Sequence, residues 1–439
     1  MKYWLNILIL LLSLTSCSLF EEELPECPDR SGEFFSLSFQ VSTCTLRSRS
    51  DSENHAEVNS EIVTFEDGID LDNLAIFIFA RVAGGTDTDE HLLIKVTDLK
   101  NDDRLSVSGS PGLYTVNTNI SNEEMTDCLG INIDPNNKPN VIFRVLMLAN
   151  CLTDDSSSTP GWDAVNATTY SGVIEQLDQW SYPMNTIYNA DYTGTDAEGI
   201  YAATNRNIPM TGTAVTSVDQ ASLYESRPDK IVFLREIYML RSLAKVRVID
   251  NIQLKNDDGY PRIMSASIIS SQNAARQIPA NALNYENGSQ VHTPNPVNTG
   301  DLPGFNDAFQ YRLGIIPGWM SITPENERKG NVFIGFIPEQ NILKENSESV
   351  EPPLPVFRLE IAVPVQAEDP ENPEKTMETR YFDVPLAGYH DQPFTFGNSI
   401  LRNHIYTLSV EQVGVTLKFT VDLVPYRVAN LDPWFGLDR

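Results

Sequence analysis

Apolar and polar residues alternate along several short stretches of the chain, a two-residue period typical of strands with one buried face. The alternation is clear over Phe35–Val41, Ala244–Ile249 and Phe357–Val363. The longest alternating run, Val415–Leu423, ends just before Pro425. Each of these stretches is expected to form a strand that packs against a core.

Two other stretches are apolar on both faces, Asn73–Ala80 and Val141–Asn150. Such strands are expected inside a sheet that is covered on both sides. One short helix is predicted over Thr168–Trp180. Further strands are predicted at Leu92–Val96, Gly112–Val116, Arg262–Ser270, Val332–Ile337 and Arg380–Val384. Many short strands with turn signals between them, and few helical periods, predict an all-β protein built from β-sandwiches.

A polar spacer that ends with Pro228 precedes a long apolar run, Ile231–Ile249. A change of this kind marks a boundary, so we predict an N-terminal β-sandwich domain over 34–227 and a C-terminal one over 228–439. The second half of the run alternates as a strand does. The first half, Ile231–Leu240, is equally compatible with a buried helical turn, because two adjacent charged residues interrupt its alternation.

Residues 1–16 have the pattern of a signal peptide. Lys2 precedes an apolar core, Leu8–Leu12, which is too short to span a membrane with margin. The segment Leu14–Cys17 resembles a bacterial lipobox, and this resemblance implies cleavage before Cys17 and attachment of lipid to its thiol. Several acyl chains, palmitate among them, anchor a protein stably to a membrane.

An acidic tether follows over residues 17–33. Its triplet Glu21–Glu23 resembles the signal that exports Bacteroidales lipoproteins to the outer face of the outer membrane, and an ordinary solvated linker is the alternative. We therefore expect a lipid-anchored protein of the outer membrane and cell surface.

The chain has 439 residues, of which 41% are hydrophobic, enough for a substantial core. Its formal net charge is -29, and no basic stripe offsets it, which excludes nucleic acid as a partner. Apart from Cys17 there are four cysteines, an even number that permits two disulfides in any of three connectivities in an oxidising compartment. They are Cys27, Cys44, Cys128 and Cys151. Their spacing predicts no metal site.

No catalytic pattern emerges from the sequence. The five histidines lack paired spacing, and there is no GxSxG, GxxxxGK[ST] or GxGxxG motif. We therefore expect no enzyme and no cofactor, although the many Asp and Glu residues leave room for an acidic catalytic pair. His404 precedes a strand and is expected to be a structural, hydrogen-bonded histidine.

The polar segment 151–207 is rich in aromatic residues. Its rings are Trp162, Trp180, Tyr182, Tyr188, Tyr192 and Tyr201. Flat rings in loops can hold sugars or protein partners at little entropic cost. The alternative is that these rings cover the end of a sandwich, and this is the interpretation we favour.

Three motifs occur in the same order as in one known family. They are Ile208–Gly212 (IPMTG) followed by Leu240–Val248 (LRSLAKVRV), the strand Leu74–Phe79, and Ile400–Leu408 (ILRNHIYTL). Together they resemble the fimbrillin superfamily, the lipoprotein pilus subunits of Bacteroidales. The resemblance implies two tandem transthyretin-like β-sandwiches.

The resemblance also implies assembly by strand exchange with other pilus subunits. In stalk subunits of the family, an arginine-specific protease cuts after the first strand, which leaves and is replaced by a neighbour's C-terminal strand. Here Phe35–Val41 corresponds to the removable strand, and Arg47 and Arg49 are the candidate cleavage sites unless they lie in a plain surface loop. Val415–Leu423, or the tail beyond it, corresponds to the donor.

The resemblance leaves the place of the protein in a fimbrium open. A cleaved chain would be a polymerising or tip subunit, whereas an uncleaved chain would be an anchor or a separate lipoprotein. Glu26–Asp29 resembles the anchor branch, while the aromatic segment favours a tip adhesin with a host ligand or glycan. The competing hypothesis is a glycan-binding surface lipoprotein of a polysaccharide-uptake system, which would bind through its tryptophans.

Overall fold

A computed structural model describes the fold. The described residues are 34–43, 68–85, 89–99, 101–110, 112–131, 133–134, 136–137, 139–151, 161–178, 180–184, 187, 207–226, 230–252, 261–269, 274–278, 310–323, 326–339, 356–365, 376–386, 400, 402–413 and 416–425. The predicted signal peptide, the acidic tether and the segment that carries Arg47 and Arg49 lie outside them.

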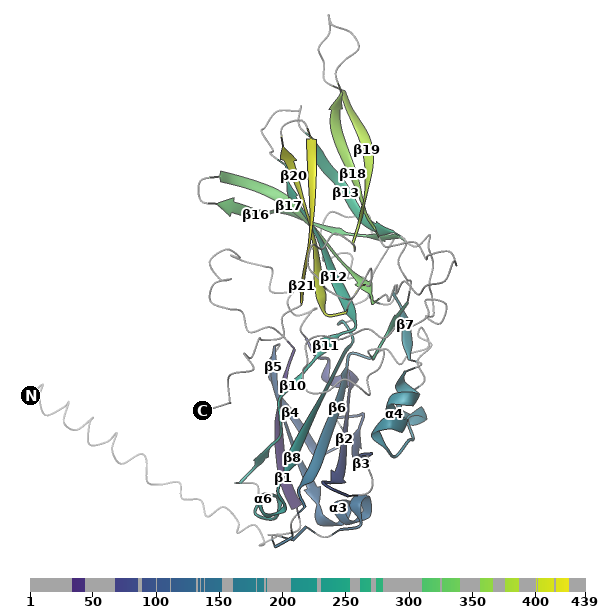
Figure 1. The fold of residues 1–439 in the computed structure, drawn as a ribbon, viewed down its shortest axis with the longest axis vertical. Coiled ribbons are helices and arrows are strands. Elements are labelled where there is room, and N and C mark those ends of the chain that lie inside the picture. Colours follow the sequence, from purple (N-terminus) through teal and green to yellow (C-terminus); the bar gives the residue numbers. More distant parts are fainter. Residues whose placement is uncertain are drawn as a thin grey trace, which may run out of the picture.

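Four main sheets make up the described part, and the predicted all-β class is confirmed (Figure 1). The first sheet contains β1 (Phe34–Ser42), β4 (Leu105–Ser110), β5 (Leu113–Ser121), β9 (Val232–Phe233) and β10 (Ile237–Tyr238). The second has the order β11 (Leu240–Arg241), β8 (Met210–Val218), β6 (Val141–Ala149), β2 (Leu74–Val82) and β3 (His91–Val96).

The third and fourth sheets come from the second half of the chain. The third has the order β16 (Gly314–Thr323), β17 (Asn326–Pro338), β12 (Leu243–Asn251), β20 (His404–Val413) and β21 (Thr416–Pro425). The fourth has the order β15 (Gln310–Arg312), β13 (Arg262–Ile269), β18 (Val356–Val365) and β19 (Thr376–Pro385). A two-stranded ribbon joins β7 (Ser181–Pro183) to β14 (Ala274–Arg276).

Each pair of sheets encloses its own apolar core. The first two sheets share a core that includes Phe39, Ile76 and Met147, and we call this unit the N-terminal sandwich. The third and fourth share a core that includes Val246 and Phe336, and we call this unit the C-terminal sandwich. The two sandwiches are stacked along the long axis of the molecule, with the N-terminal one in the lower half of Figure 1. Their transthyretin-like character stays a prediction.

Strand β2 lies between β6 and β3, which confirms that it belongs inside a sheet. One of its faces, with Ile76 and Ile78, joins the core of the N-terminal sandwich. The other face, with Phe77 and Phe79, packs under a second apolar cluster formed by residues of the 151–207 segment and Ile278. Both faces of β2 are therefore buried in apolar clusters, which explains why its sequence does not alternate.

The helices are short and lie at the margins of the sheets. They are α3 (Asn122–Leu129), α4 (Tyr170–Leu177), α6 (Gln220–Tyr224) and the 3-10 turns η2 (Leu71–Asn73) and η3 (Trp162–Ala164). Helix α4 is the helix predicted over Thr168–Trp180. The sequence reading missed α3, which begins with a capping box between Ser121 and Glu124.

The boundary predicted between residues 227 and 228 needs correction. Strands β9 and β10 pair in parallel with β1, and β11 pairs with β8, so all three belong to the N-terminal sandwich. The chain passes into the C-terminal sandwich at Ser242, between β11 and β12. The helical alternative for Ile231–Leu240 is wrong, because backbone pairing with β1 outweighs its irregular local pattern.

Gly212 of the IPMTG motif allows β10 to lie close to β8. A Cβ atom at this position would lie 2.5 Å from Ile237 Cγ2 and 2.9 Å from the Tyr238 carbonyl oxygen. Such distances are sterically forbidden, so any larger residue would push β10 away from β8. The glycine thus permits the close approach of the segment that closes the N-terminal sandwich.

Candidate functional site

Strand β1 runs through the middle of the first sheet. It pairs with β5 over its whole length, from Phe34 opposite Ser121 to Ser42 opposite Leu113. On its other side β9 and β10 pair with it in parallel, and Leu234 N donates to the Ser38 carbonyl at 2.7 Å. The strand is therefore hydrogen-bonded on both edges.

One face of β1 is fully buried in the core, and the other is buried at Ser36 and Ser38 but exposed at Phe34 and Gln40. Phe35, Leu37, Phe39 and Val41 are at most 2% exposed and fill the core of the N-terminal sandwich. At the edge of β1, Ser226, which follows α6, binds the backbone of Ser36: its hydroxyl accepts from Ser36 N at 2.8 Å and donates to Ser36 O at 2.7 Å. Together, the positions around β1 form a slot shaped for one alternating strand, which we call the strand slot.

Strand β21 is the last strand of the third sheet within the described part of the chain. It pairs only with β20 there, from His404 opposite Pro425 to Val413 opposite Thr416. Leu417 and Phe419 pack against the C-terminal core, while Lys418 between them is exposed. Among the described residues, the predicted donor strand β21 therefore lies at a sheet edge and is less enclosed than β1.

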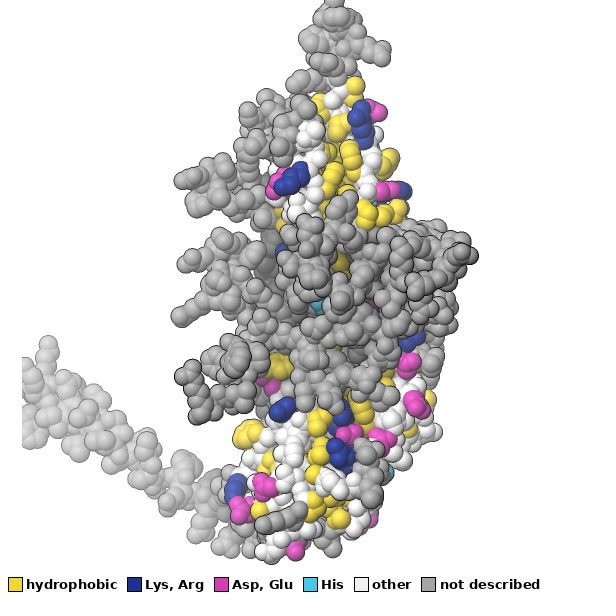
Figure 2. All heavy atoms as spheres, in the orientation of Figure 1, with side chains coloured by type: hydrophobic (Ala, Val, Ile, Leu, Met, Phe, Trp, Pro, Cys, Tyr) yellow, Lys and Arg dark blue, Asp and Glu magenta, His cyan; other side chains and the backbone are white. Residues whose placement is uncertain are grey.

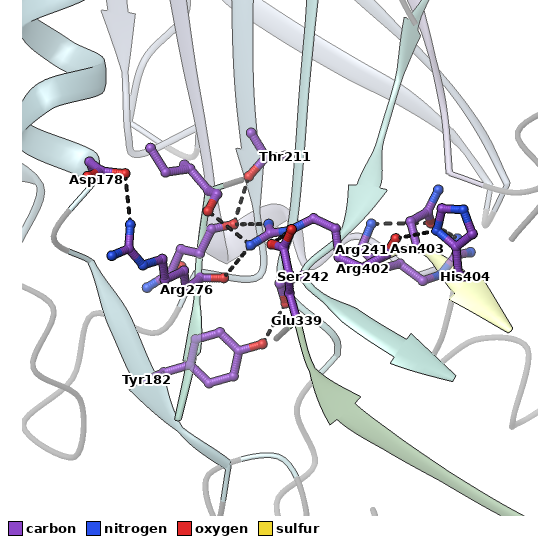
Figure 3. Close-up of polar contacts among 12 residues, drawn as sticks. Asp178, Tyr182, Thr211, Arg241, Ser242, Arg276, Glu339, Arg402, Asn403 and His404 are labelled. Atoms are coloured by element: carbon purple, nitrogen blue, oxygen red, sulfur yellow. Dashed lines mark hydrogen bonds and ion pairs between the residues drawn. The ribbon is translucent and has the colours of Figure 1, made fainter. Parts of the chain in front are cut away.

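The two sandwiches meet at a junction organised around Arg402 (Figure 3). Its guanidinium is completely buried and pairs with the Glu339 carboxylate, Nε to Oε2, at 2.6 Å. It also donates to the carbonyl oxygens of Gln277 at 3.3 Å and Ile278 at 3.0 Å. The Gln277 carbonyl accepts in addition from Thr211 Oγ1 of β8 at 3.1 Å, so one carbonyl bridges the sandwiches.

A second buried arginine, Arg241 of β11, lies at the same junction (Figure 3). Its Nη2 donates to the carbonyl of Thr43, the residue after β1, at 2.7 Å. Its Nη1 donates to Asn403 Oδ1 at 3.2 Å. Asn403 has φ 55°, a left-handed conformation that asparagine tolerates, and its backbone N donates to Leu243 O at 2.9 Å. Arg241 thus links the end of the strand slot to the C-terminal sandwich.

His404 is buried beside this network, and its Nδ1 lies 2.8 Å from the Arg402 carbonyl oxygen. This confirms the expectation of a structural histidine. The resemblance had singled out Arg402, Asn403 and Arg241 only as parts of motifs, and their roles at the junction could not be inferred from local sequence.

The described aromatic rings of 151–207 pack against the rest of the protein, and among them Trp162 stays partly exposed. Trp180 and Tyr182 are at most 2% exposed, and the Trp162 and Trp180 ring centroids are 5.0 Å apart. Tyr182 Oη lies 2.5 Å from Ser242 Oγ at the junction, and burial raises the pKa of this tyrosine. The rings cover the outer face of the second sheet and its end, so the covering interpretation is confirmed for them. A glycan site through Trp180 is incompatible with its burial.

The remaining candidate residues are only partly described. Cys17, Cys27, Cys44, Arg47 and Arg49 lie outside the described residues. Cys128 and Cys151 are free thiols, and burial raises the pKa of Cys128 to about 11 and that of Cys151 further. Neither is poised to react as a thiolate at neutral pH.

The described residues offer neither a metal site nor a membrane-spanning helix. No group of three or more His, Cys, Asp or Glu side chains among them could hold a metal ion. No described helix is long and apolar enough to cross a membrane. On the face shown in Figure 2, described Lys and Arg side chains lie next to acidic ones and form no single basic stripe. Arg358 and Asp383 form one ion pair between opposite charges, with Nη2 and Oδ2 2.7 Å apart.

Comparison with known proteins gives similarity at the level of structure alone. No protein-family model and no curated protein matches the chain. The tip fimbrial protein Mfa3 from Porphyromonas gingivalis matches with a TM-score of 0.44 and 13% identity, covering 89% of this chain and 99% of that one. A fimbrial assembly protein from Parabacteroides distasonis matches with a TM-score of 0.36 and 10% identity over 89% and 98%.

Proposed function

We propose that the protein is a structural or adhesive subunit of a cell-surface fimbrium, exported as an outer-membrane lipoprotein and assembled by strand exchange. The observation that carries the proposal is the strand slot. Its occupant, β1, is the first described strand, and the sequence segment with Arg47 and Arg49 follows it. A single cut in that segment would leave β1 held by non-covalent contacts alone.

An emptied strand slot would be strongly unfavourable. Four large apolar side chains of β1 fill the core, and each contributes about 1.5–3 kcal/mol through burial. The backbone groups of β5 that face β1 would also lose their partners, and unpaired sheet edges recruit other strands. The vacancy would therefore favour entry of a strand from another copy, with main-chain hydrogen bonds providing affinity and alternate pockets providing register.

The C-terminal end of the chain has the pattern that such a slot requires. In β21 the apolar residues Leu417, Phe419, Val421 and Leu423 recur at every second position, as Phe35, Leu37, Phe39 and Val41 do in β1. In the proposal the donor is β21 or the segment after it, taken from a neighbouring subunit.

The lipid anchor gives this assembly its place on the cell. Lipid on Cys17 would hold the newly exported chain at the outer membrane, and cleavage after Arg47 or Arg49 would separate that anchor from the fold. A released chain would then be a polymerising or tip subunit. A chain that keeps β1 would be the anchor at the base.

The proposal is tested with purified full chain that is treated with an arginine-specific protease. We expect treated protein to lose the fragment with β1 and to form multimers, seen by size-exclusion chromatography with light scattering. A synthetic peptide of residues 34–43 in excess should keep it monomeric, because it refills the slot.

Two variants complete this test. The double variant Arg47→Ala, Arg49→Ala should stay uncut and monomeric, whereas Arg104→Ala, which alters an exposed ion pair with Asp102, should behave as the wild type. Protein that is cut after Arg47 or Arg49 but neither releases β1 nor associates would contradict strand exchange.

A further inference from the structure

The strand slot ends at Thr43, where a charged side chain binds the backbone. Thr43 N donates to Gly112 O at 3.1 Å, and Ser42 O accepts from Met239 N at 2.9 Å, as in an ordinary sheet. The Thr43 carbonyl is bound differently, because its partner is the Arg241 guanidinium, 2.7 Å away. Arg241 is 2% exposed, so this contact is shielded from water.

Arg241 is held in place from the opposite side. Asn403 Oδ1 accepts from Arg241 Nη1 at 3.2 Å and from the Arg241 backbone N at 3.4 Å. Asn403 is itself tied to Leu243 O, at the start of β12. The C-terminal sandwich therefore fixes the direction in which the guanidinium points, which is toward the end of the strand slot.

A guanidinium that binds a backbone carbonyl does not recognise any particular side chain. It recognises the presence of an acceptor at one place along the strand. A hydrogen bond to a charged group strengthens binding roughly tenfold or more, and a buried donor that loses its acceptor is costly. A strand that stops one residue short would forfeit this contact, while a longer one would keep it.

We propose that Arg241 is a specificity-determining residue of the strand slot, which selects occupants whose backbone extends to position 43 and presents a carbonyl there. This inference rests on the proposed exchange of β1. It adds a length and register requirement that the apolar alternation cannot supply, since an alternating strand shifted by two residues presents the same pattern.

The test uses the full chain with a specific protease sequence inserted between residues 44 and 67, so that a nick leaves β1 in place. Two fluorescent peptides then compete for the slot. One is residues 34–43 with a C-terminal amide. The other is residues 34–42 as the N-propylamide, which keeps an N–H at position 43 but has no carbonyl there.

In wild-type protein the 34–43 peptide should bind roughly tenfold or more tightly than the propylamide, as expected for one hydrogen bond to a charged group. In Arg241→Met the two peptides should bind equally. In Arg144→Met, which removes a buried arginine of the second sheet that pairs with Glu90, the wild-type preference should remain. Equal binding of both peptides to wild-type protein would overturn the inference while leaving strand exchange intact.

A second measurement covers the case in which neither peptide enters, which would contradict the proposed exchange itself. Release of the severed native fragment is then followed by size-exclusion chromatography in increasing urea. For each variant, the urea concentration that releases the fragment is divided by the urea midpoint of global unfolding. This ratio should be clearly lower for Arg241→Met than for Arg144→Met. Release of the fragment at the same relative urea in both variants would overturn the role of Arg241.

Discussion

At the scale of single residues, the junction depends on charges that are fully removed from water. Arg402 is the clearest case, because its guanidinium pairs with Glu339 and donates to carbonyls from another part of the chain. Burying an ion pair is not stabilising by itself, but removing one partner from a buried pair is strongly destabilising. The arrangement therefore fixes how the sandwiches meet more than it adds to stability.

Replacing Arg402 with Met should lower the free energy of unfolding by about 3–5 kcal/mol, because the Glu339 carboxylate and the carbonyls lose their donor. Urea unfolding followed by tryptophan fluorescence measures the loss. Arg380→Met is the control, since the Arg380–Glu378 pair is more than half exposed and should contribute less than about 1 kcal/mol. Equal losses in the two variants would contradict the importance of burial.

Asp250 of β12 gives a prediction on pH. Burial raises the pKa of its carboxyl to about 6, although Ile252 N donates to it at 3.0 Å. The folded state therefore binds this proton more tightly than the unfolded state, and the group destabilises the protein above its folded pKa. As the pH falls from about 7 to about 4, this penalty disappears.

Asp250→Asn should therefore be more stable than the wild type at pH 7.5, by up to about 3 kcal/mol, since one unit of pKa corresponds to about 1.4 kcal/mol. The difference should shrink toward zero near pH 4. Urea unfolding of both proteins across this range measures it, and comparing the two cancels the contribution of the other carboxylates. A difference that does not vary with pH would show that Asp250 is not the titrating group.

At the scale of elements, β1 is the strand on which the account depends. Phe39 is completely buried in the N-terminal core, whereas Phe34 at the start of the same strand is 40% exposed. Phe39→Ala should cost about 3–5 kcal/mol of unfolding free energy, and Phe34→Ala less than about 1 kcal/mol. In the nicked chain, Phe39→Ala should also release the β1 fragment at lower urea. Similar costs for both would mean that β1 is not seated as described.

The elements that the sequence predicted well are those in which one force dominates. Strands β1 and β12 alternate because one face meets a core, and β2 is apolar throughout because both faces do. Helix α3 was missed although its capping box could be read from Ser121 and Glu124. Strand β4 was missed because its sequence, LSVSGS, has little apolar periodicity.

The boundary and the junction depend on contacts between residues far apart in sequence. Strands β9 to β11 follow a spacer that resembles a linker, yet their pairing with β1 and β8 assigns them to the N-terminal sandwich. The pairing of Arg241 with Thr43 spans 198 positions. Local patterns carry no information on such contacts, so the sequence indicated the slot but not the residue at its end.

At the scale of the whole molecule, two sandwiches share one buried polar junction, and the strand slot ends at that junction. The aromatic rings described between residues 151 and 207 cover a sheet, with Trp180 buried and Trp162 partly buried. Under the proposed function, the slot would connect the place of cleavage with the contact to a neighbouring subunit.

The most direct test of this account is the intact mass and N-terminal sequence of the protein taken from its native outer membrane. The account predicts a mature chain that starts at Ser48 or Ser50, lacks β1 and its lipid, and is found in high-mass assemblies. A full-length chain with acylated Cys17 and β1 retained in those assemblies would contradict release of the strand. It would favour an anchor or a separate surface lipoprotein instead.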